Sequence, residues 1–164
     1  MSEIIKGKIW KLGDDIDTDI ILPTEYLAFK TVDEMKPYAF SPLREELASL
    51  IKSGDIIVAG KNFGCGSSRE QAPEVVKALG IKCIVAKSFA RIFFRNAINN
   101  GVLLIECDNL YENVSEGDVI EIEVGKEIKA NGHTYPIGSL PENLLDIINA
   151  GGLVNAMRKK NGLN

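Results

Sequence analysis

Three short apolar runs constrain the fold of this chain more than any other feature of its sequence. The runs cover residues 56–59, 81–86 and 102–105, and each has the length of a buried strand. A segment with apolar residues at helical spacing separates each run from the next. Because connections of this kind are right-handed, the order predicts a parallel sheet with helices packed against it. We therefore expect an α/β fold.

A longer strand and further helices are predicted around this core. Residues 4–12 alternate apolar and charged side chains, as a half-buried strand does. The Ser-Pro pair at 41–42 predicts the start of a helix that ends before Gly54. Ser88 is expected to cap a helix that runs through Asn99. The apolar face of this last helix is expected to consist of Phe89, Ile92, Phe93 and Ala97.

The final third of the sequence has the pattern of antiparallel strands. Asn131 and Gly132 form a strong hairpin signal between two short strands. We find no repeat and no linker composition, so residues 1–164 are expected to form a single domain. Its predicted fold is a parallel strand–helix core with a β-rich antiparallel flank. The predicted flank strands cover 119–124, 126–130 and 133–135, and the closing helices cover 141–149 and 152–159.

Composition and charge exclude several classes of protein. Nineteen basic against 23 acidic residues give a net charge of −4, without the basic surface that binds nucleic acid or membranes. No apolar run approaches the roughly 18 residues of a membrane span, and the start of the chain does not resemble a signal peptide. We expect a cytoplasmic protein. Three scattered cysteines and one histidine predict neither a disulfide framework nor a metal site on this chain.

The polar loop at 61–70 is the most informative segment for function. It follows a predicted strand and precedes a helix, which is where open α/β sheets bind ligands. Gly64 and Gly66 allow the backbone to approach a bound group closely. Ser67 and Ser68 supply hydroxyls beside the free amides, and Arg69 supplies a planar fork that fits a carboxylate. The loop predicts an anion-binding site.

Simpler interpretations of these residues remain open. Ser67 and Glu70 have the spacing of a capping box, although Pro73 indicates that the regular helix begins near Ala72. Cys65 is a candidate nucleophile, but a structural cysteine is commoner.

Nearby charged residues also have two interpretations. Arg91 and Arg95, four residues apart, either add to the anion site or are solvated. The acidic segment at 13–19 lacks the calcium-binding pattern of an EF-hand, and a solvated turn remains an alternative to a role in the site.

Two of these segments carry a family resemblance. Residues 62–72, Asn-Phe-Gly-Cys-Gly-Ser-Ser-Arg-Glu-Gln-Ala, and residues 87–92, Lys-Ser-Phe-Ala-Arg-Ile, resemble signature segments of the swivelling domain of the aconitase superfamily. Residues 13–23 are similar to the start of that domain. As a free-standing chain, the sequence resembles the small subunits of 3-isopropylmalate dehydratases, with homoaconitases and dimethylmalate dehydratases as relatives. The resemblance implies a β/β/α swivelling domain.

The resemblance also implies that two subunits supply different parts of the active site. A large subunit holds a four-iron–four-sulfur cluster, and the small subunit closes over it, so no cofactor is expected on this chain. The motif assigns the general base to Ser67 and carboxylate binding to Ser68 and Arg69. Thr18 and Asp19 receive a supporting role, as do the two motif glycines. The lone chain should be inactive.

Substrate choice is expected to depend on the segment after Tyr26 and Leu27. In the family, the residues that follow this pair face the variable side group of the substrate. Here they are Ala28, Phe29 and Lys30, which predict a mainly apolar wall and favour isopropylmalate over tri-acids of the homocitrate type. Dimethylmalate and citramalate also fit such a wall, and Lys30 leaves homoaconitate as an alternative.

Two further hypotheses come from other classes of function. The same loop would serve a stand-alone anion-binding or regulatory module, and Cys65 would serve a hydrolase. If the chain is a dehydratase subunit, residues 13–31 and 61–69 should share one face, with a mobile loop at 26–31.

Overall fold

The seven strands of the described residues belong to one sheet. The computed structural model describes residues 3–139 and 141–162. In spatial order the strands are β4-β3-β2-β1-β5-β6-β7. The first four in this order are parallel, and the rest pair antiparallel. The strands are β1 (Ile4–Leu12), β2 (Ile56–Ala59), β3 (Cys83–Ala86), β4 (Leu103–Glu106), β5 (Val119–Glu123), β6 (Glu127–Ala130) and β7 (His133–Pro136).

Strand β1 joins the parallel and antiparallel halves of the sheet. Its second half pairs in parallel with β2, in a register that sets Ile9 opposite Ile56. Its first half pairs antiparallel with β5, where Ile5 lies opposite Ile122. One strand of nine residues therefore belongs to both halves.

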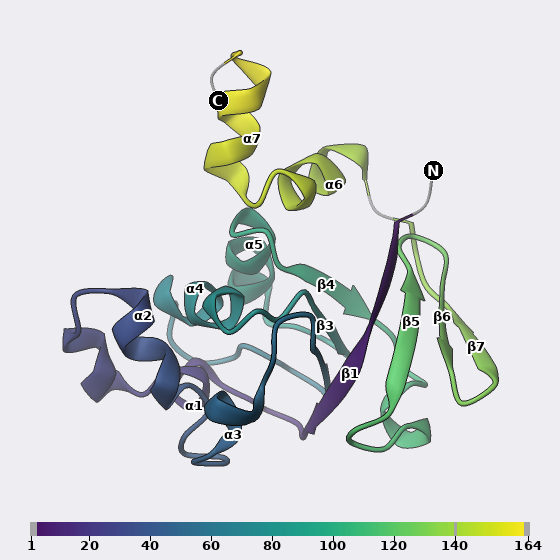
Figure 1. Cartoon of the computed structure of the whole chain (residues 1–164), viewed down its shortest axis with the longest axis horizontal. Helices are drawn as coiled ribbons and strands as arrows, with labels where there is room; N and C mark the ends of the chain where they lie inside the picture. The colour runs from purple at the N-terminus through teal and green to yellow at the C-terminus, as the bar shows by residue number, and fades with distance from the viewer. Residues whose placement is uncertain (1–2, 140, 163–164) are drawn as a thin grey trace.

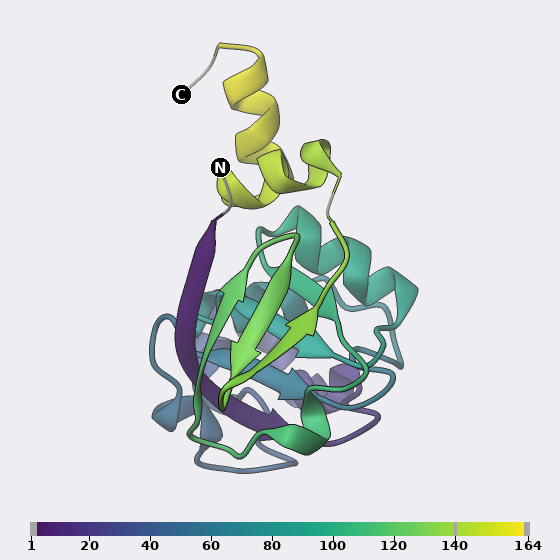
Figure 2. The ribbon, with the colours of Figure 1, turned by 90° about the vertical axis from the view of Figure 1, so that its right-hand side faces the viewer.

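The two halves of the sheet fold over each other and leave helices on the outer face. Ile57 and Ile84 face a core shared with the helices. Val58 and Val85 point the opposite way and share a second core with Ile122 of the antiparallel half. Because both faces of β2 and β3 are covered, every residue of these strands is buried. The layers are helices, parallel strands and antiparallel strands (Figures 1 and 2), which confirms the β/β/α expectation.

Two helices cover the outer face of the parallel strands. Helix α4 buries Val75 and Val76, and α5 buries Phe93 and Ala97. Helix α6 contacts α5 and packs Leu144 and Ile148 against the core, whereas α7 extends away from the layers at the end of the chain (Figure 1). The helices are α1 (Thr18–Ile21), α2 (Val32–Met35), α3 (Leu47–Leu50), α4 (Gln71–Ala78), α5 (Arg91–Asn99), α6 (Glu142–Asn149) and α7 (Leu153–Lys160), and the 3-10 helices are η1 (Thr24–Ala28), η2 (Lys36–Tyr38) and η3 (Tyr111–Asn113).

The long helix predicted from the Ser-Pro pair at 41–42 is wrong. Only α3 forms there, and it has four residues. The buried residue Phe40 takes a left-handed conformation with φ of 61°, and its carbonyl accepts hydrogen bonds from the N–H groups of Leu43 and Arg44. These bonds close a turn in which the Ser-Pro pair lies, so the regular helix starts later.

The predicted cap of α5 is also wrong. The helix begins at Arg91 and follows Ala90, whose side chain provides no cap. Ser88 instead accepts a hydrogen bond at its Oγ from the N–H of Asn62. Ile92, expected on the apolar face, is 57% exposed.

The predicted antiparallel flank and its hairpin are confirmed. Asn131 and Gly132 join β6 to β7, and both have the positive φ that a two-residue hairpin turn requires. Within the described ranges, no helix has the length and apolar character needed to cross a membrane.

Candidate active site

Three loops meet where the parallel strands end. The loop after β2 carries the motif, and the loops after β1 and β3 lie on either side of it. The N–H of Gly64 donates to the carbonyl of Ile16, and the N–H of Phe63 donates to the carbonyl of Ser88. Ligand sites in open α/β sheets lie at this edge, so the topology places the motif where the sequence predicted a site.

The acidic segment contacts the motif loop, although Asp14 and Asp15 are themselves exposed. Asp14 accepts a hydrogen bond at Oδ1 from the N–H of Lys61 at 2.7 Å, and Asp15 accepts one from the side chain of Asn62 at 3.1 Å. Asp17 caps α1 by accepting from the N–H of Ile20. The carboxylates of Asp14 and Asp15 therefore hold the first loop against the motif loop, whereas that of Asp17 orders α1.

Thr18 binds the motif loop through two groups. Its N–H donates to the carbonyl of Cys65, and its hydroxyl donates to the carbonyl of Ser67, each at 2.8 Å. The Thr18 residue is only 2% exposed, so these bonds are shielded from water. Thr18 therefore fixes the backbone that carries the serines.

Helix α4 does not begin with a capping box. It starts at Gln71, and Glu70 precedes it without a side-chain cap. Ser67 lies outside the helix, in the loop. Pro73 falls within the first turn, where its missing N–H has no intrahelical partner to lose, as the proline argument anticipated.

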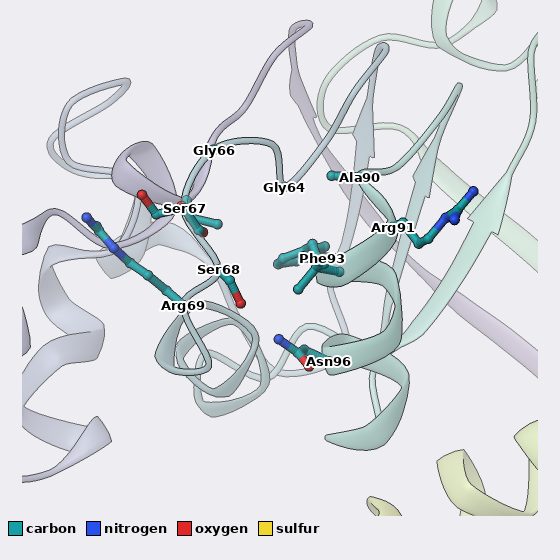
Figure 3. Close-up of a pocket in the computed structure, with 11 residues that line it drawn as sticks. Gly64, Gly66, Ser67, Ser68, Arg69, Ala90, Arg91, Phe93 and Asn96 are labelled. Carbon is teal, nitrogen blue, oxygen red and sulfur yellow. The ribbon is translucent and has the colours of Figure 1, made fainter.

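The two serines of the motif face different directions. Figure 3 shows the side chain of Ser68 directed toward Asn96 of α5, whereas Ser67 and Arg69 point away from Asn96. A cavity of about 220 Å³ lies between the motif loop and α5, with Phe93 in its wall. Ser67 and Ser68 are both exposed, so the hydroxyls are accessible to a ligand.

Arg69 ties the motif loop to the segment after α1. Its guanidinium donates to the carbonyl of Leu22 and to the hydroxyl of Thr24, each at 2.8 Å, and forms an ion pair with Asp19. The Arg69 side chain is only 13% exposed. These contacts fix the direction of the cation.

A close backbone approach explains one of the two motif glycines. Gly64 has φ of +85°, and a Cβ built on it would lie 2.2 Å from Cγ of Phe93. The Phe93 ring packs edge-on against Phe63, with ring centroids 5.4 Å apart. Gly64 thus lets the loop lie directly on the aromatic core.

The candidate substrate-wall residues do not line this cavity. Ala28 and Lys30 are exposed. The half-buried ring of Phe29 lies 6.0 Å from that of Tyr26 and 5.7 Å from that of Tyr38. The hydrogen bond between Arg69 and Thr24 joins the motif loop to the start of the same segment. Of the predicted site residues, the cavity is lined by Thr18, Gly64, Gly66, Ser67, Ser68 and Arg69.

Cys65 has the environment of a poor nucleophile. Partial burial raises the pKa of its thiol, and the carboxylates of Asp17 and Asp15 raise it further. A reactive cysteine needs the opposite shift. The geometry therefore disfavours the hydrolase hypothesis.

Besides Phe93, the cavity is lined by Arg91, Ile92 and Asn96 of α5. Arg91 lies at its edge, exposed and directed away from the serines, as the solvated interpretation expects (Figure 3). Asn96 was not among the sequence candidates. Its spacing of three residues from Phe93 indicates the same helix face, and that signal was available in the sequence.

The fold and this loop define a swivelling domain of the aconitase type. The family model of the aconitase C-terminal domain matches residues 29–110. The chain is 74% identical over 163 residues to a 3-isopropylmalate dehydratase small subunit from Lachnospira eligens, with 99% of each chain covered. The chain belongs to the family of these small subunits.

Archaeal relatives extend the comparison. An isopropylmalate/citramalate isomerase small subunit from Methanocaldococcus jannaschii is 48% identical over 164 aligned residues. The alignment covers 98% of this chain and 97% of the archaeal chain. A crystal structure of a 3-isopropylmalate dehydratase chain from the same organism superposes with a TM-score of 0.90 at 42% identity, covering 97% of this chain and 96% of that one.

Proposed function

We propose that this chain is the small subunit of a heteromeric hydro-lyase that interconverts 2-isopropylmalate and 3-isopropylmalate in leucine biosynthesis, a branched-chain amino-acid pathway in the cytoplasm. The observation that carries the proposal is the placement of Ser67 and Arg69 on one loop that Thr18 holds at the sheet edge. The names of the full-length relatives support the reaction and the subunit role.

In the proposed reaction Ser67 is the general base. It takes the proton from the carbon next to a carboxylate, while the hydroxyl on the neighbouring carbon leaves as hydroxide, so that the elements of water are lost. Return of the proton and the hydroxide with their two carbons exchanged completes the isomerisation. A serine hydroxyl is a weak base at neutral pH, so its alkoxide needs preorganised stabilisation. Within the described residues, the N–H groups of Gly66, Ser67 and Ser68 donate no hydrogen bond, which leaves them available for this task.

Ser68 and Arg69 are proposed to bind the carboxylates of the substrate. A guanidinium has five N–H donors, and the contacts of Arg69 with Asp19, Leu22 and Thr24 leave donors unused. The fixed direction of the side chain lowers the entropy lost when it binds a carboxylate.

The cofactor is proposed to belong to the large subunit. Among the described residues there is no group of three or more His, Cys, Asp or Glu side chains that would hold a metal ion. A four-iron–four-sulfur cluster on the partner would act as the Lewis acid that helps the hydroxyl leave. This chain contributes the base, the carboxylate donors and one wall of the site.

The side group of the substrate is proposed to contact Ala28 and Phe29. The aromatic stack of Phe29 with Tyr26 and Tyr38 supports an apolar surface that suits a branched alkyl group. Lys30 is exposed on the same segment, so homoaconitate remains the charged alternative. Citramalate and dimethylmalate are smaller alternatives, and the archaeal isomerase relative is named for one of them.

Reconstitution with a cluster-bearing large subunit tests this function. We expect turnover from the complex and none from either chain alone, with the highest kcat/KM for isopropylmalate among the four candidate substrates. Turnover by the lone chain without iron would refute the subunit role. Dicarboxylate binding by the lone chain, with no turnover in the complex, would support the anion-binding module instead. A clear preference for homoaconitate would assign the substrate contact to Lys30.

A further inference from the structure

We propose that Asn96 is an additional substrate-binding residue, whose side-chain amide donates a hydrogen bond to a carboxylate of the hydroxy di-acid in the cavity beside Ser68. This inference rests on the proposed function and extends it to α5, a helix outside the motif.

The helix geometry directs Asn96 into the cavity. Phe93 is buried at 3% exposure and anchors one face of α5 against the motif loop. Asn96 follows three residues later on the same face, where the helix rises out of the core. Its side chain is half-buried and lines the cavity together with Ser67 and Ser68. In Figure 3 the Asn96 amide points across the cavity toward the hydroxyl of Ser68.

The Asn96 amide has no protein partner in the described part of the chain. The neighbouring side chain of Asn100 donates to the backbone carbonyl of Asn96 at 2.8 Å, and the Asn62 amide donates to Asp15. No such bond is formed by the side chain of Asn96, whose position is set by the helix alone. A half-buried amide with unused donors and acceptors is suited to a polar ligand.

The directions of the motif side chains explain why a second binding group is needed. Arg69 is held by Leu22, Thr24 and Asp19 on the side of the loop away from Asn96. A di-acid has two carboxylates, and Arg69 can hold one of them. Ser68 and Asn96 face the remaining space, where the apolar wall formed by Phe93 strengthens a hydrogen bond to a charged oxygen.

Steady-state kinetics of the reconstituted complex test the proposal. Asn96→Asp keeps the shape of the side chain and places a negative charge near the substrate carboxylate, so KM should rise about 10- to 100-fold with a smaller change in kcat. Asn96→Leu removes the hydrogen bond without adding charge and should raise KM less. Asn155→Asp, on an exposed turn of α7, makes the same charge change and should leave KM unaltered.

The outcomes separate the inference from the proposed function. If the wild-type complex shows no turnover of any candidate substrate, the proposed function fails. If the wild type turns over and both Asn96 variants retain its KM, the inference fails while the function stands. Weakened assembly with the large subunit at unchanged KM, measured by titration of one subunit against the other, would assign Asn96 to the interface and also overturn the inference. Thermal melting shows whether each variant folds. If Asn96→Asp does not fold, the KM of Asn96→Leu decides.

Discussion

The hydroxyl of Thr18 donates a hydrogen bond to the backbone carbonyl of Ser67 across 49 positions of sequence, at 2.8 Å. The acceptor is the backbone carbonyl of Ser67 and not its side chain. The bond therefore positions Ser67 and leaves the Ser67 hydroxyl, the proposed base, free to react. Two loops that are far apart in the chain thereby act as one unit.

Thr18→Val should test this connection. Valine has nearly the same shape but cannot donate, and it leaves the Ser67 carbonyl without this partner. We expect the free energy of unfolding to fall by about 1–2 kcal/mol. In the reconstituted enzyme we expect the fold decrease in kcat to exceed the fold increase in KM. Thr134→Val on β7, an exposed site, is the matched control. Unchanged kcat in a stable Thr18→Val variant would remove Thr18 from the site.

Ser67→Ala should lower kcat by at least ~10², with KM nearly unchanged, because it removes the proposed base and little binding surface. Ser49→Ala, which loses only an exposed hydrogen bond to the carbonyl of Glu46, serves as the control. The measurement is initial rates over a range of substrate concentrations. Near-normal turnover by Ser67→Ala would refute the assignment of the base.

Arg69→Lys should mainly raise KM. A lysine ammonium cannot contact Leu22, Thr24 and Asp19 in the planar geometry of a guanidinium and also grip a carboxylate at two points. Asp19→Asn should raise KM less, since Arg69 keeps its other two partners. Equal losses of kcat and kcat/KM with unchanged KM would instead indicate that Arg69 acts only in the transition state.

Gly64→Ala should destabilise the protein by about 2–4 kcal/mol, from the strain of a positive φ together with overpacking against Phe93. Gly117→Ala separates the two causes. Gly117 has φ of +95° but no atom within 4 Å of a built Cβ, so only about 1 kcal/mol should be lost there. Urea unfolding of both variants measures the difference. Equal losses would show that Phe93 moves aside freely.

Cys65 should be alkylated more slowly at pH 7 than a free cysteine, with a rate that rises toward and above pH 9. The pKa of its thiol lies above the ordinary value of 9.0, first because of burial and then because of the carboxylates of Asp17 and Asp15, so little thiolate exists at neutral pH. Asp15→Asn should shift the pH–rate profile modestly to lower pH. Iodoacetamide labelling followed by mass spectrometry gives the profile, and faster labelling than a free thiol at pH 7 would contradict it.

The parallel core was predictable because its residues leave few alternatives. Runs such as 56–59 are apolar throughout, and only a strand covered on both faces suits them. The region at 41–53 was not predictable from local pattern. There the burial of Phe40 overrides the helix signal of the Ser-Pro pair, and only tertiary contacts decide that burial.

In the candidate site, too, local sequence predicts some features and tertiary contacts decide the others. The position of the motif loop at a strand end is a local property, and the sequence predicts it. The partner of each side chain is not local: Arg69 is joined to Leu22 and Thr18 to Ser67 by contacts that span more than 40 residues. Asn96 lies outside the motif segments. Its spacing from Phe93 indicates a helix face, but the packing of α5 against the loop brings that face to the cavity.

The double membership of β1 affects how the chain folds. Residues Ile4–Lys8 find their β5 partners, Val119–Glu123, only after more than 100 intervening residues. Pairing at such separations is slow, because the entropy of closing the loop is lost before the contacts form. During synthesis the first half of β1 must wait unpaired until the ribosome has released β5, while its second half can already pair with β2. The parallel half should therefore consolidate first, and the open edge of β1 is the place where an interrupted chain would aggregate.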